Sequence, residues 1–177
     1  MHDWPAATFD EIPPPRLVAA WARLGTVPTE RVPLWAAHWL VDGYDGEALR
    51  SLAGFGRTES HEVHDTLPDA LADCGTPVPD SVSAAAQVTF TNLARIHAAG
   101  TVGERWIADK VDEIVAAANY ATSVMNLPLG QLYALSEEWE NGWGRTEQQL
   151  KTEVRDACTA QLAAPPTTAP EPAPGHN

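Results

Sequence analysis

The apolar residues of this chain recur every three or four positions along almost its whole length. Within 104–125, for example, Ile107, Val111 and Ile114 follow one another at steps of four and three. This spacing puts side chains on one face of an α-helix, whereas a half-buried strand alternates at every second residue. Because no segment sustains such alternation, the sequence predicts an all-α protein. Asp112 lies on the opposite side of this helix from Ile114, where replacement by alanine should be nearly neutral.

Glycines and prolines between the apolar stripes divide the chain into seven or eight helices of mixed length. We expect short helices before the extended connector 76–79 and longer ones after it. The connector would separate two subdomains if the chain were divided, but a length of 177 residues is typical of one domain. The prediction is therefore a single orthogonal bundle over 13–162. The expected helices are about 15–24, 32–42, 45–53, 68–75, 81–99, 104–125, 128–141 and 146–162.

Local signals set three of these boundaries. Proline lacks a backbone N–H and costs about 3 kcal/mol inside a helix. We therefore expect Pro68 to begin a new helix after one or two turns near 60–66. Thr101 with Glu104, and Thr146 with Gln149, have the spacing of capping boxes at helix starts.

The two ends of the chain have compositions that do not favour packing. Residues 1–12 show no sustained period, and 163–177 contain five prolines and no large apolar side chain. Such segments bury too little surface to offset the entropy lost on ordering, so we expect both ends to be disordered. The first five residues have neither the basic nor the apolar region of a signal peptide.

Acidic residues outnumber basic ones by 24 to 11, which gives a net charge of −13. Nucleic-acid binding and adhesion to anionic lipid both need clustered Lys and Arg, so this balance argues against both. No apolar run reaches the ~18 residues of a membrane span. Cys74 and Cys158 have no metal or redox spacing and are expected to be buried free thiols of a cytoplasmic protein. The excess of Arg over Lys, together with the many alanines, indicates a GC-rich bacterial genome.

The segment 58–79 concentrates negative charge and contains no Lys or Arg. A field of this kind speeds association with a protein that has a basic surface. Trp143, flanked by two glycines, lies outside any helical apolar stripe and is expected to be an exposed anchor. The predicted partner-binding residues are Glu59, Glu62, Asp65, Asp69 and Trp143.

Both faces of the helix expected at 32–42 are apolar. Trp35 and Trp39 lie on one face, and Leu34, His38 and Val41 form a stripe beside it. Either this helix is central to the bundle, or one of its faces contacts a partner.

A second interpretation of the acidic segment is a metal site. In a helix, His61, His64 and Asp65 would share a face, and two imidazoles with a carboxylate can bind Zn or Fe. The spacing is not that of a His-Glu-x-x-His metalloprotease, and Pro68 would disturb a third ligand from Asp69. The other reading of these residues is a solvated first helical turn with acids near its start.

Two functions therefore follow from the residues. The first is an acidic cytoplasmic protein that works by binding another protein, in an immunity, antitoxin-like or regulatory role, without a cofactor. The sequence has no Gly-x-Ser-x-Gly element or other catalytic signature. The alternative is a metal-dependent enzyme of the helical-bundle type that uses His61, His64 and Asp65 with Zn or Fe. The sequence does not indicate the oligomeric state.

Overall fold

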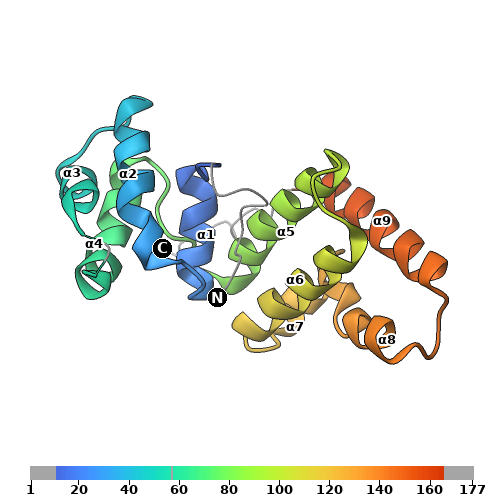
Figure 1. Ribbon diagram of the computed structural model, residues 1–177. Helices are drawn as coiled ribbons and strands as arrows, with labels where there is room; N and C mark the ends of the chain where they lie inside the picture. Colours follow the sequence, from blue (N-terminus) through green and yellow to red (C-terminus); the bar gives the residue numbers. More distant parts are fainter. Residues whose placement is uncertain (1–10, 57, 166–177) are drawn as a thin grey trace, which may run out of the picture.

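The computed structural model describes residues 11–56 and 58–165, which form helices and turns without any strand (Figure 1). The predicted all-α class is confirmed. The first helices are α1 (Pro15–Leu24), α2 (Val32–Val41), α3 (Glu47–Gly54) and α4 (Ser60–Asp73). Those that follow are α5 (Val82–Ala98), α6 (Glu104–Ala117), α7 (Thr122–Met125), α8 (Leu135–Asn141) and α9 (Glu147–Ala163). Two short 3-10 helices are η1 (Thr29–Arg31) and η2 (Gly130–Leu132).

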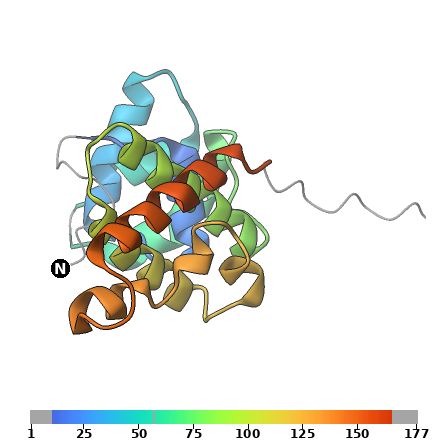
Figure 2. The same ribbon diagram turned by 90° about the vertical axis from the view of Figure 1, so that its right-hand side faces the viewer.

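Helix α5 lies in the middle of the molecule, between two groups of helices. Helices α2, α3 and α4 lie on one side in Figure 1, and α6 to α9 lie on the other. Helix α1 packs against α5 from the first group, and α9 packs against it from the second. Viewed from the α9 side, α9 crosses the front of the molecule and α8 lies at its lower end (Figure 2). The buried apolar residues of both groups form one cluster.

Tryptophans supply much of the core of the first group. Trp21, Trp35 and Trp39 are almost fully buried, and the ring centroids of Trp21 and Trp35 are 6.1 Å apart. The indole Nε1–H of Trp39 donates to the carbonyl of Pro13 at 2.9 Å, which fixes the chain just before α1. Burial of each such side chain contributes at least about 1.5–3 kcal/mol to the free energy of unfolding. The helix predicted at 32–42 is thus present, and its tryptophan face is buried.

Gln161 of α9 is polar, and it connects this helix to α5 and to the segment before η2. It is fully buried on α9. Its Oε1 accepts from the backbone N–H of Leu129 at 3.3 Å, and its Nε2 donates to Thr91 of α5 at 3.3 Å. A buried amide is costly unless its hydrogen bonds are made, so these contacts fix the position of α9 on α5.

Pro68 does not begin a helix, contrary to the sequence prediction. Helix α4 runs without a break from Ser60 to Asp73 and contains Pro68 in its interior. The proline lies on an exposed part of the helix, while Val63 and Leu67 are buried with two further residues of the same stripe. Burial of this continuous stripe outweighs the one helical hydrogen bond that proline removes.

The predicted helix 104–125 is also divided differently. Helix α6 ends at Ala117, and Asn119 and Tyr120 adopt left-handed backbone conformations. The Tyr120 N–H bonds the carbonyl of Val115 at 2.9 Å, closing the helix end before the short α7 begins. The apolar pattern continues through this break because Val124 of α7 is buried in the same core. Apolar spacing alone does not reveal such a reversal of the chain.

The segment predicted as a helix over 128–141 consists of η2 and the shorter α8. Ala134, at the start of α8, has a positive φ of 68°. Its N–H donates to the Asp112 carboxylate of α6 at 2.8 Å, and the Ser136 hydroxyl donates to the same carboxylate. Asp112 therefore caps α8 from another helix, and these contacts argue against the expectation that its replacement by alanine is nearly neutral.

The two predicted capping boxes have different outcomes. Thr146 and Gln149 form a complete capping box at the start of α9, as predicted. Helix α6 instead begins after Gly103 with no side-chain cap from Thr101. Glu104 turns away to accept a hydrogen bond from Arg155 of α9 at 2.6 Å. An ion pair between two helices thus replaces the local cap.

Of the segments predicted to be disordered, residues 1–10 and 166–177 lie outside the described part of the chain. Ile12, just inside it, packs against the core, and α9 continues through Ala163. Both cysteines are buried free thiols, as predicted. Burial raises the pKa of Cys74 and of Cys158 to about 11. None of the described helices is long and apolar enough to cross a membrane.

Candidate functional site

Three acidic residues form an exposed row on the outer face of α4. Glu62, Asp65 and Asp69, here called the acidic stripe, are spaced three and four residues apart and are all exposed. Val63 and Leu67, on the opposite face, are buried against the core. The helical period therefore separates the carboxylates from the packed side and directs them to solvent.

The acidic stripe receives little compensation from its surroundings. Within the described residues, no ion pair joins a Lys or Arg to any of its three carboxylates. Asp65 has an imidazole partner, His61, whose Nδ1 lies 3.0 Å from the carboxylate, and both side chains are mostly exposed. A hydrogen bond to its own backbone and the charge of Asp65 raise the pKa of His61. The stripe is thus a concentration of negative charge open to solvent.

Glu59 and Asp73, at the two ends of α4, have structural contacts. The Glu59 carboxylate accepts from the backbone N–H of Gly56 and holds the turn before the helix. Asp73 accepts from the N–H of Leu49 at 3.1 Å and so satisfies the start of α3. A Cβ at Gly46 would meet the Asp73 carboxylate at 2.1 Å, so the close approach requires glycine. Sequence spacing does not reveal this role of Asp73, because α3 and α4 must first be packed.

The residues of the predicted metal site are only partly brought together. His61 and Asp65 form the pair on the outer side of α4. His64 lies on another side, where it lines a hollow of about 160 Å³ with Leu67 and Pro68. Among the described residues there is no group of three or more His, Cys, Asp or Glu side chains arranged to hold a metal ion.

Trp143 lies on the connection between α8 and α9 and is 61% exposed. The flanking Gly142 and Gly144 have φ angles of +63° and +87°, which favour glycine. A Cβ at Gly144 would come within 2.8 Å of the Glu138 carboxylate. The exposed tryptophan is therefore held on a tight turn whose shape depends on its two neighbours.

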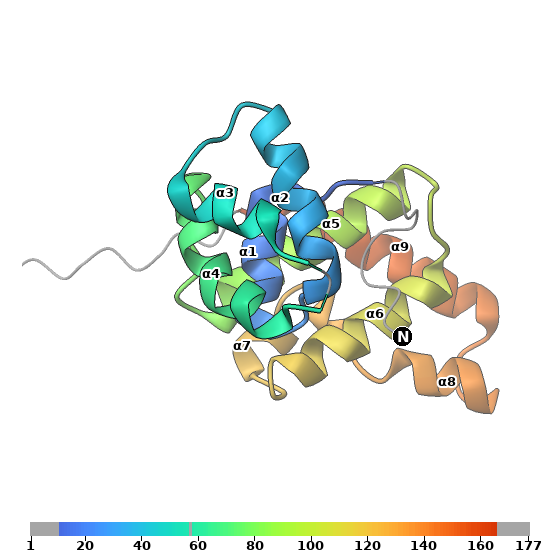
Figure 3. The same ribbon diagram turned by 60° about the vertical axis from the view of Figure 1, so that its left-hand side comes forward.

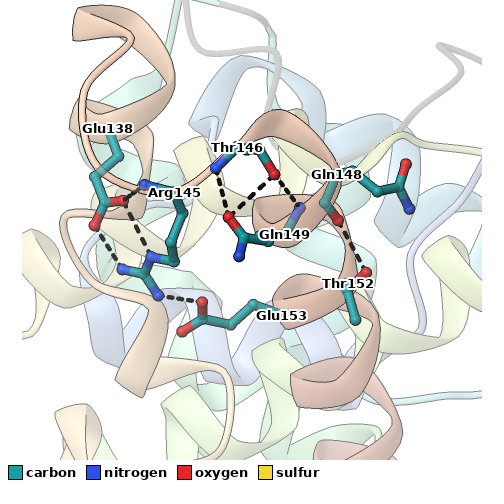
Figure 4. Close-up of polar contacts among 7 residues, drawn as sticks. All are labelled: Glu138, Arg145, Thr146, Gln148, Gln149, Thr152 and Glu153. Atoms are coloured by element: carbon teal, nitrogen blue, oxygen red, sulfur yellow. Dashed lines mark hydrogen bonds and ion pairs between the residues drawn. The ribbon is translucent and has the colours of Figure 1, made fainter.

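An ion-pair network holds the ends of this turn (Figure 4). Arg145 donates from Nε to Glu138 at 3.1 Å and from a terminal nitrogen at 2.5 Å, and its other terminal nitrogen pairs with Glu153 of α9. The hydrogen bonds from Arg145 lower the pKa of Glu138, and those to the two carboxylates raise the pKa of Arg145. The network connects α8 to α9 across the segment that carries Trp143.

The two predicted contact regions are far apart. Helix α4 lies at one end of the molecule, and the α8–α9 connection lies at the other in both Figure 1 and Figure 3. The structure therefore does not bring the acidic stripe and Trp143 into one surface patch. A single small partner would contact one of them and not both.

The second apolar face of α2 is exposed to solvent. Leu34 is 54% exposed and Val41 is 84% exposed, and His38 between them is also exposed. Trp35 and Trp39 on the other face are buried. Helix α2 therefore packs on one side only, so it is not enclosed on both faces as a central helix would be.

A cleft of about 570 Å³ lies where the α1–α2 connection meets the C-terminal end of α6. Val27, Pro28 and Glu30 contribute to one wall, and Glu113 and Ile114 contribute to the other. Its volume falls in the range of pockets that enclose small organic ligands. No local sequence pattern indicates this cleft, because its two walls are far apart along the chain.

The chain matches no protein-family model, no curated protein and no solved structure.

Proposed function

We propose that this protein binds another protein with a basic surface, and that the acidic stripe of α4 is the docking face. The supporting observation is the contrast between this stripe and acids elsewhere on the molecule. Several other carboxylates are neutralised within the fold, through the pairs Asp45–Arg50, Glu104–Arg155, Glu138–Arg145, Glu153–Arg145 and Glu147–Lys151. The stripe carboxylates have no such Lys or Arg partner within the described residues.

The physical effect of the stripe would be on the rate of association. Each exposed ion pair with a partner would add only about 0.2–1 kcal/mol of binding free energy. The summed field of several like charges acts over a Debye length of about 8–10 Å and guides an oppositely charged surface into contact. Binding through this face should therefore be fast at low ionic strength and strongly dependent on salt.

An immunity, antitoxin-like or regulatory role fits such a module. These roles require a stable, acidic surface that captures one partner, and they require no catalytic group. The two buried free thiols are compatible with a reducing bacterial cytoplasm. Trp143 would then be a second contact for a large partner or for a different one.

The test replaces the stripe by neutral residues of nearly the same shape. The partner is first captured from an extract of the source organism with the tagged wild-type chain, identified by mass spectrometry and purified. Association of that partner with wild type and with the triple variant Glu62→Gln, Asp65→Asn, Asp69→Asn is then followed by stopped flow at two ionic strengths. We expect the association rate at low salt to fall by about three- to tenfold and its salt dependence to flatten.

A matched control removes three exposed acids near the other end of the molecule. The control variant is Glu137→Gln, Glu140→Gln, Asp156→Asn, which changes the net charge equally. It should associate at close to the wild-type rate if the position of the charges matters. If both triple variants bind at the same rate and with the same salt slope, α4 is not the docking face. Trp143→Ala would then be the next variant to examine.

A further inference from the structure

The cleft between the α1–α2 connection and α6 has an apolar floor and two carboxylates. Ile114, which is 1% exposed, forms part of the floor, and Val27 and Pro28 line it from the α1–α2 connection. Glu30 lies on the same side as Pro28, and Glu113 lies on the α6 side. One acidic residue thus comes from each wall, and none of the described residues that line the cleft is Lys or Arg.

The helix ends around the cleft add to its negative potential. Helix α1 ends at Leu24, with Gly25 as its C-cap, and helix α6 ends at Ala117. Gly25 and Ala117 both line the cleft. The C-terminal end of a helix carries roughly half a negative charge, so two such ends favour a cation. The start of η1 also lines the cleft, and it carries the opposite partial charge. Glu30 lies within this first turn.

Lys110 reduces this potential without removing it. Its Nζ donates to Glu113 at 2.7 Å and lies 5.6 Å from the centre of the Trp106 ring. Its ammonium compensates one of the two carboxylates, which leaves one formal negative charge together with the two helix ends. A ligand with a single positive charge would balance this remaining negative charge.

We propose that this cleft is a binding site for a small amphipathic organic cation, with an apolar body on Ile114, Val27 and Pro28 and a protonated amine between Glu30 and Glu113. The volume of about 570 Å³ accommodates a ligand of drug-like size. This site is separate from the proposed docking face, because none of the acidic-stripe residues lines the cleft. Its test therefore does not depend on the protein partner.

The probe for this site is 4-phenylbutylammonium, compared with two molecules of similar size. These are neutral 4-phenylbutanol and anionic 4-phenylbutyrate. Each is titrated into the ¹⁵N-labelled full chain, and chemical shifts are followed by NMR. We expect the cation to shift the amide signals of Thr26, Val27, Thr29 and Glu30 and those of residues 114–117. It should bind at least about fivefold more tightly than the alcohol. Equal affinity for the three probes, or shifts elsewhere only, would overturn the proposal.

Two variants test whether the cation binds in the cleft. Ala117→Trp would fill the space from the exposed last turn of α6, and Ala160→Trp on an exposed position of α9 is its control. The first should weaken binding of 4-phenylbutylammonium by about tenfold or more, and the second should leave it unchanged.

Glu30→Gln tests the charge without disturbing the pair between Lys110 and Glu113. It should weaken binding of the cation by about two- to fivefold and leave the affinity for the alcohol unchanged. Unchanged affinity for the cation in both Ala117→Trp and Glu30→Gln would overturn the assignment of the site. A thermal melt of each variant verifies that it remains folded.

Discussion

Two regions of this protein are rich in acidic residues, but their carboxylates have different surroundings. On α4, Glu62, Asp65 and Asp69 lie on a helix face that has no Lys or Arg partner within the described residues. At the α8–α9 turn, Glu138 and Glu153 are held by one guanidinium, that of Arg145. The carboxylates of the first region are exposed to solvent, whereas those of the second region connect two helices through Arg145. Acidic composition therefore indicates function only after internal ion pairs are accounted for.

Asp112 is a further acid that connects two helices, and it lies in the second group of helices. It belongs to the same helix as Ile114 and yet accepts hydrogen bonds from Ala134 and Ser136 at the start of α8. Its carboxylate is thus a cap between helices. We expect the buried apolar core of α6 to contribute most to stability, followed by the cap at Asp112, the Arg145 network and the acidic stripe.

The largest effect is expected for Ile114→Ala. Ile114 is 1% exposed, and shortening a buried isoleucine to alanine removes apolar contacts and leaves a cavity. We expect the free energy of unfolding to fall by about 2–5 kcal/mol, measured by urea denaturation. A loss below about 1 kcal/mol would show that the neighbouring walls of the cleft collapse into the space.

A smaller loss is expected for Asp112→Ala. It removes the acceptor for the Ala134 N–H and the Ser136 hydroxyl, and loss of a helix cap costs about 0.5–2 kcal/mol. The same denaturation experiment measures it, with Asp112→Asn as a control that keeps one acceptor oxygen and should lose less. If Asp112→Ala leaves the free energy of unfolding unchanged, Asp112 contributes no more to stability than the acids of the stripe.

The Arg145 network should contribute less than the buried cap, because its groups are partly exposed to water. Replacing Arg145 by Met keeps most of the side-chain length and removes the donors to Glu138 and Glu153. We expect the Tm to fall by about 2 °C at neutral pH. The control Arg16→Met removes an exposed arginine for which no ion pair is seen within the described residues, and it should change the Tm by less.

The same variant predicts a pH dependence with a definite sign. Arg145 lowers the pKa of Glu138 from its ordinary value of 4.5, so the folded state binds this proton less readily than the unfolded state. The stabilisation is complete above about pH 4.5 and is lost as the pH falls through the lowered pKa of the folded state. The Tm difference between wild type and Arg145→Met should therefore narrow when the pH is reduced from about 7 to about 3. A constant difference would show that the arginine acts through packing alone.

The smallest effect on folding is expected at the acidic stripe. The triple variant Glu62→Gln, Asp65→Asn, Asp69→Asn removes like charges that lie on one helix face and have no Lys or Arg partner among the residues that the structure describes. Its Tm should stay within about 2 °C of wild type or rise slightly, because mutual repulsion is relieved. A clear fall in Tm would mean that the stripe stabilises the fold and is not a surface kept free for a partner.

Much of the helical architecture follows from local spacing. Val63 and Leu67 belong to an apolar stripe that predicts the buried side of this segment, and the helical period places Glu62 and Asp65 away from it. Asp69 joins them on one face only because α4 continues through Pro68. The capping pair Thr146 and Gln149 is likewise visible, because both residues belong to the same helical turn. Helical period and capping involve residues a few positions apart, so they can be recognised without knowing how the helices pack.

The ends of helices and the contacts between them depend on the packed chain. The apolar spacing runs through the turn at Asn119 and Tyr120 because residues on both sides enter the same core. Pro68 remains inside α4 because its buried stripe outweighs one lost hydrogen bond. In both cases the free energy of packing exceeds the local preference of the backbone.

The amino-acid order alone specifies that the chain is helical and that the segment 58–79 is acidic, because helical period and composition are properties of neighbouring residues. The single helix face shared by Glu62, Asp65 and Asp69 depends on the packing that keeps Pro68 inside α4. Only the tertiary structure decides that Arg145 neutralises Glu138 and Glu153, that Asp112 caps α8, and that α1 and α6 end at a common cleft. These features depend on distances between segments that are separated along the chain. Electrostatic interactions fall steeply with such distances, so the function of each acid is set by what the fold places beside it.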